Sequence, residues 1–157
     1  MIIERADISD ANQILLLQKL AYSSEADIYN DFGIIPMSQT LDDIERDFKK
    51  CIFLKIVTDY KIIGSVKVIG SVKAYDKEGT CHIGRLIVHP DFQNMGIGTR
   101  LMMEIENIFK DSKRFELFTG DKSQKNLYLY QKLGYKRFKE QKIDNINYLY
   151  LEKRRIR

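Results

Sequence analysis

The sequence QNMGIGTRLM, residues 93–102, places two glycines one position apart at the junction of two different patterns. The preceding run CHIGRLIV is strand-like and ends at His89-Pro90, where proline has no N–H for a strand ladder. The following run is apolar at helical spacing, through Leu101 and Ile105. Glycines at such a junction let the free N–H groups of a helix N-terminus approach an anion, because they carry no Cβ atom. The stretch therefore predicts a phosphate-binding turn between a strand and a helix.

Two well-known phosphate-binding motifs fit this turn poorly. A Walker loop requires lysine and then serine or threonine after its second glycine, whereas Gly98 is followed by Thr99 and Arg100. A dinucleotide-binding fingerprint requires a third glycine where Leu101 stands, although Glu116 lies about where its acidic residue would be. A dinucleotide-binding domain therefore stays open as an alternative.

The rest of the chain predicts a mixed α/β domain with the element order β-α-α-β-β-β-α-β-α-β-β. Strand patterns cover residues 1–5, 51–59, 62–75, 81–88, 114–120, 135–142 and 146–153. Helical patterns cover residues 10–21, 41–50, 97–109 and 126–133. Strands outnumber helices, so the domain is expected to be built around one sheet.

Local patterns set the ends of several elements. The first helix is defined by apolar positions that should face the core, namely Ile14, Leu17, Leu20 and Ala21. Its pattern breaks over residues 22–38. Thr40, with Asp43 three residues later, forms a capping box for the second helix, and Ser123 is a suitable N-cap for the last one. Residues 59–61 are expected to form a hairpin turn.

The length is ordinary for one domain, which is expected to cover residues 1–157. No apolar run approaches the roughly 18 residues that cross a bilayer, and the N-terminal sequence MIIERADISDANQ has acids where a secretory signal would be apolar. A cytoplasmic protein with no membrane partner is therefore expected. Cys51 and Cys81 form no paired motif, and neither histidine lies near an acidic pair at ligand spacing, so no metal site is expected.

Two motifs together resemble those of one family. QNMGIG, residues 93–98, resembles the Q-x-x-G-x-G acyl-CoA pyrophosphate loop of the GNAT N-acetyltransferases. YQKLGY, residues 130–135, resembles the Tyr-x-x-x-Gly-Tyr/Phe pattern that ends a later helix in that family. The resemblance covers nearly the whole chain. It implies the GNAT fold, an α/β arrangement in which a mostly antiparallel mixed sheet of about six or seven strands is flanked by about four helices.

The resemblance implies acetyl-CoA as the acyl-donor co-substrate. The loop would bind its pyrophosphate through Gln93, Asn94, Met95, Gly96, Ile97, Gly98, Thr99 and Arg100. In the family the strand before the loop splays from its neighbour and leaves backbone groups free for the pantetheine arm, at positions held here by Leu86, Ile87 and Val88. An asparagine that commonly contacts the cofactor is replaced by Ser123, and Asn126 is assigned that role instead.

Acetyl transfer to an amine requires a neutral nucleophile and a protonated leaving thiolate. Tyr130 matches the tyrosine that acts as general acid near the thioester sulfur in many members, whereas Tyr128 points elsewhere on a helix. His82 stands where some members place a glutamate base, and a histidine can take a proton near neutral pH. Glu25 is the rival base.

Charge is unevenly distributed along the chain. Residues 22–47 contain seven acids and one base, whereas fifteen bases and eight acids follow from residue 93 onward. The acidic segment, with Tyr29 and Phe32, corresponds to the acceptor region of the family. Its carboxylates favour a cationic acceptor, either a small-molecule or a peptide amine. The resemblance implies that this amine attacks the thioester directly in a ternary complex. Homodimers are common among relatives.

Two further classes of function remain as alternatives. The basic tail EKRRIR and the basic second half fit nucleic-acid binding, with tyrosine and phenylalanine for stacking. No nucleic-acid motif occurs, so an enzyme without a nucleic-acid partner is expected. A catalytically inactive acyl-CoA sensor would keep the same cofactor loop.

Overall fold

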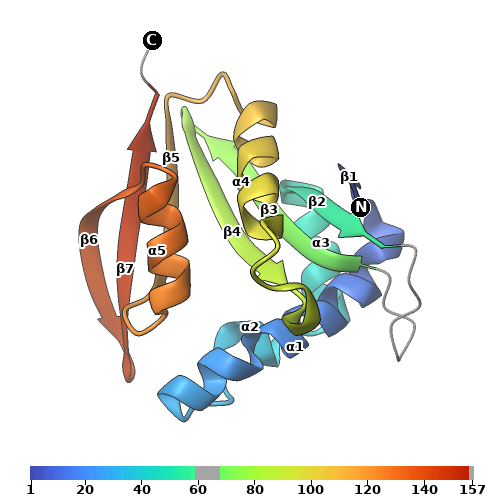
Figure 1. Ribbon diagram of the computed structural model, residues 1–157, viewed down its shortest axis with the longest axis horizontal. Coiled ribbons are helices and arrows are strands. Elements are labelled where there is room, and N and C mark those ends of the chain that lie inside the picture. The colour runs from blue at the N-terminus through green and yellow to red at the C-terminus, as the bar shows by residue number, and fades with distance from the viewer. Residues whose placement is uncertain (59–67, 156–157) are drawn as a thin grey trace.

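The computed structural model describes residues 1–58 and 68–155, and Figure 1 shows their elements. Within them seven strands form one sheet in the order β1-β2-β3-β4-β5-β7-β6. The strands are β1 Ile2–Arg5, β2 Ile52–Val57, β3 Val68–Lys77, β4 Thr80–Val88, β5 Arg114–Gly120, β6 Lys136–Ile143 and β7 Ile146–Arg154. The helices are α1 Ala11–Tyr29, α2 Ile35–Ser38, α3 Leu41–Lys50, α4 Ile97–Ile108 and α5 Gln124–Lys132, with 3-10 turns at Ile8–Asp10 and Pro90–Phe92. The predicted mixed α/β class is confirmed, and the one-turn α2 is an addition to it.

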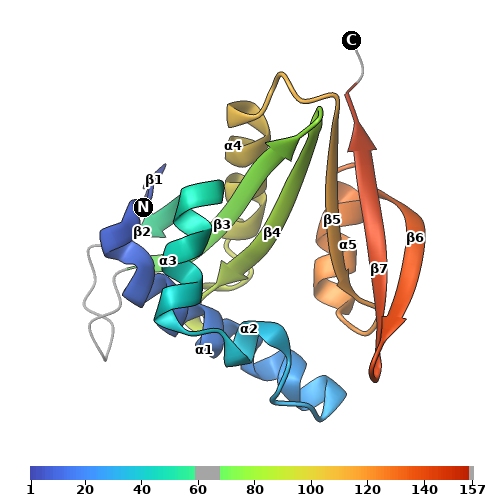
Figure 2. The same ribbon diagram turned by 180° about the vertical axis from the view of Figure 1, so that it is seen from behind.

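Helices cover both faces of the sheet. α4 and α5 lie against one face (Figure 1), and α1, α2 and α3 lie against the other (Figure 2). Five of the six strand pairings in the described residues are antiparallel, and β4 pairs with β5 in parallel. Since a dinucleotide-binding fold has a mostly parallel sheet, this topology argues against that alternative.

The main core lies between the sheet and α4. Ile97, Leu101 and Ile105 are buried as their spacing predicts, whereas Ile108, on the last turn, is 38% exposed. At Gly70 of β3 an added Cβ would lie 2.9 Å from Cγ2 of Ile97. The missing side chain at this position therefore lets the first turn of α4 approach the sheet closely.

The parallel pair β4 and β5 is joined over a short length. Thr80–His82 pairs with Arg114–Glu116, after which the two strands diverge toward α1 (Figure 1). β4 continues to Val88 along β3, and β5 continues to Gly120 along β7. The sheet is therefore split next to the glycine turn, as the resemblance implies.

Helix α1 is longer than its sequence pattern predicts. The pattern stops at residue 21, but the helix continues to Tyr29 and ends at Asn30, whose φ of 49° is left-handed. Leu20, predicted to face the core, is 43% exposed, whereas Gln18 is buried. The reason is that the inward stripe of α1 runs through polar residues such as Gln18, so apolar spacing alone misplaces both the helix end and its buried face.

The sequence also predicted the N-terminal caps of α3 and α5. The capping box of Thr40 and Asp43 is confirmed. Ser123 occupies the N-cap position of α5, but its side chain makes no capping hydrogen bond. The expected hairpin turn at 59–61 and the strand residues 62–67 lie outside the described residues. In the part of the chain that is described, no helix has the length and apolarity needed to cross a membrane.

Candidate active site

A cavity of about 420 Å³ opens where β4 and β5 diverge. Its walls come from α1 and α2, from strands β3, β4, β5, β6 and β7, and from α5. The lining residues that bear on chemistry are Tyr22, Glu25, His82, Arg85, Asn126 and Tyr130. The three predicted catalytic residues therefore reach one cavity, although they come from α1, β4 and α5.

The glycine turn forms the N-terminus of α4. Gly96 is the N-cap, and its φ of 76° lies in the left-handed region that glycine adopts without steric cost. The first helical hydrogen bond runs from the amide of Arg100 to the carbonyl of Gly96, so the N–H groups of Ile97, Gly98 and Thr99 precede it. An added Cβ on Gly96 would meet no atom within 4 Å. Open space beside unpaired helix amides is the arrangement that binds an anion.

Leu86 lies between this turn and the cavity. An added Cβ on Gly98 would lie 3.8 Å from Cδ2 of Leu86 and 3.3 Å from Cδ2 of Leu129 on α5, and Leu86 also lines the cavity. Of the other two strand residues assigned to the cofactor, Ile87 is 3% exposed and Val88 packs against the main core. Their side chains belong to the core, so any contact with a ligand would be made by their backbone.

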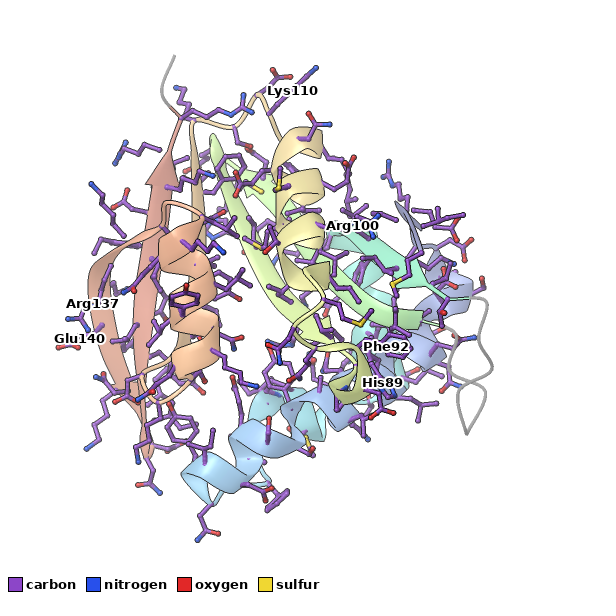
Figure 3. All side chains as sticks on the ribbon, viewed as in Figure 1. His89, Phe92, Arg100, Lys110, Arg137 and Glu140 are labelled. Atoms are coloured by element: carbon purple, nitrogen blue, oxygen red, sulfur yellow. The ribbon has the colours of Figure 1, made fainter. Side chains whose placement is uncertain are left out.

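The remaining loop residues assigned to the cofactor are on the surface. Gln93, Asn94 and Met95 are exposed and precede the helix. Arg100 is exposed too, and its Nη2 donates to the carbonyl of Met1 at 3.4 Å, on the side of α4 that faces β1 (Figure 3). The Arg100 guanidinium is therefore directed away from the turn that its backbone helps to form.

His89 follows β4 and stabilises the short 3-10 turn that precedes the glycine turn. His89 is 6% exposed, and its ring packs edge-on against Phe92 with centroids 5.7 Å apart (Figure 3). Its Nδ1 accepts a hydrogen bond from the amide of Asp91 at 3.1 Å. His89 therefore caps the 3-10 turn between β4 and the glycine turn.

Tyr130 of α5 is 6% exposed and lines the cavity. Burial is the main cause that raises the pKa of its phenol, and the nearby Tyr22 and Glu25 raise it further. The phenol is therefore protonated at neutral pH, as a general acid must be before it donates to a thiolate, and its raised pKa makes it a weaker acid than a free phenol. Tyr128, two residues earlier, is 69% exposed, as its position on the helix predicts.

Glu25 joins α1 to α5 at the inner wall of the cavity. Its Oε1 accepts hydrogen bonds from Oγ of Ser123 at 2.7 Å and from Nδ2 of Asn126 at 3.1 Å. Burial raises the pKa of this carboxyl, and the bond from Ser123 and the charge of Arg85 oppose that rise. The side chain of Asn126, assigned to the cofactor from the sequence, is therefore engaged by Glu25, because α1 extends far enough to meet the start of α5.

His82 lies at the closed end of the split. Its Nδ1 is 3.7 Å from Oε2 of Glu116, and its ring stacks on Tyr75 with centroids 5.0 Å apart. Glu116 in turn accepts a hydrogen bond from Arg114 at 2.8 Å. His82 is therefore held within a charged cluster at the last residues that β4 and β5 share, whereas Glu25 is close enough to Tyr130 to interact with it electrostatically.

The acidic segment contributes less to the cavity than its composition predicts. Of its seven acids Glu25 alone lines the cavity, since Asp43 caps α3 and Asp47 accepts a hydrogen bond from a lysine at 2.7 Å. Tyr29 lines the cavity, whereas Phe32 is 58% exposed elsewhere. Among residues 1–58 and 68–155, no group of histidine, cysteine or acidic side chains could hold a metal ion.

One protein-family model matches most of this chain. The family model for the acetyltransferase (GNAT) family matches residues 17–135, which include α1 from residue 17 onward, the split strands, the glycine turn and Tyr130. The chain belongs to the GNAT acetyltransferase family.

Solved structures of GNAT proteins match this domain over almost its full length. The ribosomal-protein-S18-alanine N-acetyltransferase of Escherichia coli matches with a TM-score of 0.77 and 11% identity, over 96% of this chain and 91% of that one. PaiA N-acetyltransferase from Thermoplasma acidophilum, in complex with coenzyme A, matches with a TM-score of 0.71 and 19% identity, over 99% and 100%. An aminoglycoside 6'-N-acetyltransferase complexed with coenzyme A matches with a TM-score of 0.73 and 17% identity, over 98% and 97%. At such low identities these matches show a shared fold alone, through TM-scores of 0.71 to 0.77. No curated protein sequence matches.

Tyr22 and Arg85 are cavity residues of this GNAT domain to which the sequence assigned no individual role. Tyr22 sits in the part of α1 beyond the predicted helix end, and burial raises the pKa of its phenol to about 12. Arg85 is a charged residue inside the apolar run that forms β4, next to Gly84. An arginine directly before the apolar residues that end β4 was the available indication that this position has a special environment.

Proposed function

We propose that this GNAT domain transfers an acetyl group from acetyl-CoA to a primary amine by direct attack in a ternary complex. The observation that carries the proposal is the cavity at the strand split, which the buried Tyr130 and the carboxylate of Glu25 share. The free amides of the glycine turn lie next to its wall at Leu86. A donor from the α4 and α5 face and an acceptor from the α1 face would then meet in the split.

The donor assignment rests on the helix terminus and on the fold. Two of the matched structures contain coenzyme A, which supports an acyl-CoA as the donor. We assign the pyrophosphate to the N–H groups of Ile97, Gly98 and Thr99, where the positive end of the α4 dipole adds to the hydrogen bonds. The pantetheine arm would follow the inner edge of β4 near Leu86. Acetyl is the acyl group that we propose.

Two protons move when a neutral amine attacks the thioester, and the cavity residues can exchange both of them. The amine nitrogen attacks the thioester carbonyl carbon, and the carbon–sulfur bond breaks as the tetrahedral intermediate collapses. Tyr130 donates its phenolic proton to the departing thiolate, while Glu25 takes the proton that the nitrogen loses, directly or through a water molecule. Transfer of that proton to the phenolate restores both groups. His82 is the alternative base, at the closed end of the split.

Calorimetric titration with acetyl-CoA tests the donor assignment, with NAD and a mixed-sequence oligonucleotide as parallel controls. Micromolar binding of acetyl-CoA alone is expected. Binding of NAD or of the oligonucleotide without binding of acetyl-CoA would overturn the proposal. Thiol release in the presence of amines then tests catalysis, and tight acetyl-CoA binding without thiol release from any amine would favour the inactive sensor instead.

A further inference from the structure

Arg85 has an unusual backbone at the wall of the cavity. Its φ is 51°, in the left-handed region that side chains other than glycine rarely adopt. The pairing of β3 with β4 shifts at this point, because Ser71 faces Ile87 whereas Lys73 faces Gly84. Arg85 and Leu86 therefore form a bulge, and bulges re-aim side chains next to active sites. Strained backbone of this kind persists where the surrounding structure holds it.

The Arg85 side chain lines the cavity, and the side chains that it contacts, Gln39 and Tyr22, are uncharged. Its Nε donates to Oε1 of Gln39 at 3.4 Å, and Gln39 also accepts from Nε2 of Gln18 at 2.8 Å. The guanidinium further interacts with the hydroxyl of Tyr22. Within residues 1–58 and 68–155, no carboxylate lies within ion-pair distance of Arg85, although Glu25 is close enough to interact electrostatically.

The other charged side chains of the cavity wall are already engaged. Lys73 pairs with Asp47 at 2.7 Å, and Glu116 pairs with Arg114 at 2.8 Å. Glu25 accepts hydrogen bonds from Ser123, the N-cap of α5, and from Asn126 in that helix. Arg85 thus differs from them in offering a permanent positive charge and several N–H donors to whatever enters the cavity.

We infer that the amine acceptor also carries a carboxylate, and that Arg85 binds this group. The inference rests on the proposed function and names the class of its acceptor as an amino acid or another small amino-carboxylate. A guanidinium binds a carboxylate through two parallel hydrogen bonds, which fixes orientation as well as position. The ammonium end of the same molecule would then lie toward Glu25. The acceptor inferred here therefore bears both charges, whereas the acceptor expected from composition was wholly cationic.

The experiment compares matched acceptors that differ at one group. Each free amino acid is paired with its amide and with the amine that lacks the carboxyl carbon, for example phenylalanine, phenylalaninamide and phenethylamine. The wild-type protein is expected to show a kcat/KM at least about tenfold higher for the carboxylate than for its amide, carried mainly by KM. In Arg85→Gln this ratio should fall toward one, and Arg85→Lys should retain part of it, because lysine keeps the charge without the bidentate geometry.

Controls separate this inference from the proposed function. Arg137→Gln, which removes an exposed arginine on β6, should keep the wild-type ratio. Arg85→Gln should bind acetyl-CoA as tightly as wild type, which also shows that the variant is folded. Equal use of amides and carboxylates, an unchanged ratio in Arg85→Gln, or turnover of no amino-carboxylate would overturn the inference. Failure of the wild-type protein to bind acetyl-CoA would overturn the proposed function itself.

Discussion

The hydroxyl of Ser123 donates a hydrogen bond of 2.7 Å to Oε1 of Glu25, a residue 98 positions earlier in the chain. The bond crosses the split in the sheet, since α1 packs on the β3 and β4 side while α5 follows β5. Nearby, the Tyr29 hydroxyl donates to Oδ1 of Asp121 at 2.9 Å and accepts from the amide of Lys122 at 2.8 Å. The second half of α1 therefore ties the two parts of the sheet together and positions the proposed base.

Removal of the hydrogen bond from Ser123 to Glu25 should change the pH dependence of acetyl transfer. The Ser123 hydroxyl lowers the pKa of Glu25, so Ser123→Ala should raise that pKa further above the ordinary value of 4.5. Glu25 must be ionised to take a proton, and activity is lost as pH falls through its pKa. The acidic limb of the kcat/KM profile should therefore move to higher pH in Ser123→Ala and disappear in Glu25→Gln. Ser24 is exposed on α1, so Ser24→Ala should leave the acidic limb in place. An acidic limb that changes only in His82→Gln would identify His82 as the base.

Tyr130→Phe should slow the chemical step without weakening the donor complex. Loss of a general acid lowers kcat by about 10²- to 10⁴-fold, whereas the change removes one oxygen and leaves the aromatic packing in place. The acetyl-CoA dissociation constant from calorimetry should stay at the wild-type value. Tyr128→Phe is the matched control, because Tyr128 is 69% exposed on the same helix. Equal kcat values for the two variants would rule out the proposed acid.

Substitutions at Gly96 should lower the stability of the protein through backbone conformation and not through side-chain volume. A Cβ there would meet no atom within 4 Å, but alanine is strained at a φ of 76°. Gly96→Ala should therefore lower the free energy of unfolding by about 1 kcal/mol. Gly96→Asn should lower it less, because asparagine tolerates the left-handed region better. Urea denaturation measures both, and a larger loss in the asparagine variant would contradict the conformational explanation.

Substitutions at Gly70 and Gly84 test the effect of side-chain volume, because neither glycine has a positive φ and the two differ in the space around an added Cβ atom. An added Cβ at Gly70 would lie 2.9 Å from Ile97 and 3.1 Å from Leu101, whereas at Gly84 it would only touch the end of Lys73 at 3.8 Å. Gly70→Ala should cost about 1 to 3 kcal/mol of unfolding free energy through overpacking. Gly84→Ala should be neutral or stabilising by up to about 1 kcal/mol, because alanine restricts the unfolded chain. Thermal or urea unfolding that ranks the two in reverse order would contradict the packing of α4 on β3.

The sequence was most informative where structure depends on neighbours in the chain. The glycine turn, the capping box at Thr40 and the strand pattern of β5 are local, and each was predicted with its residues. The hydrogen bonds of Glu25 were not, because Ser123 and Asn126 meet it only after the chain has folded. The bulge at Arg85 was also missed, since strand register depends on pairing between β3 and β4 and leaves no period in the sequence.

Strand β6 closes one side of the sheet, and all of its residues are exposed. Such an edge presents unpaired N–H and C=O groups that could recruit an identical strand from another copy. Its sequence KRFKEQKI is rich in charge, Arg137 and Glu140 point outward (Figure 3), and the pairing with β7 shifts between Arg137 and Lys139. Charge and an irregular ladder both discourage edge-to-edge aggregation. A homodimer of this chain, if it forms, should therefore associate through another surface and leave β6 in water.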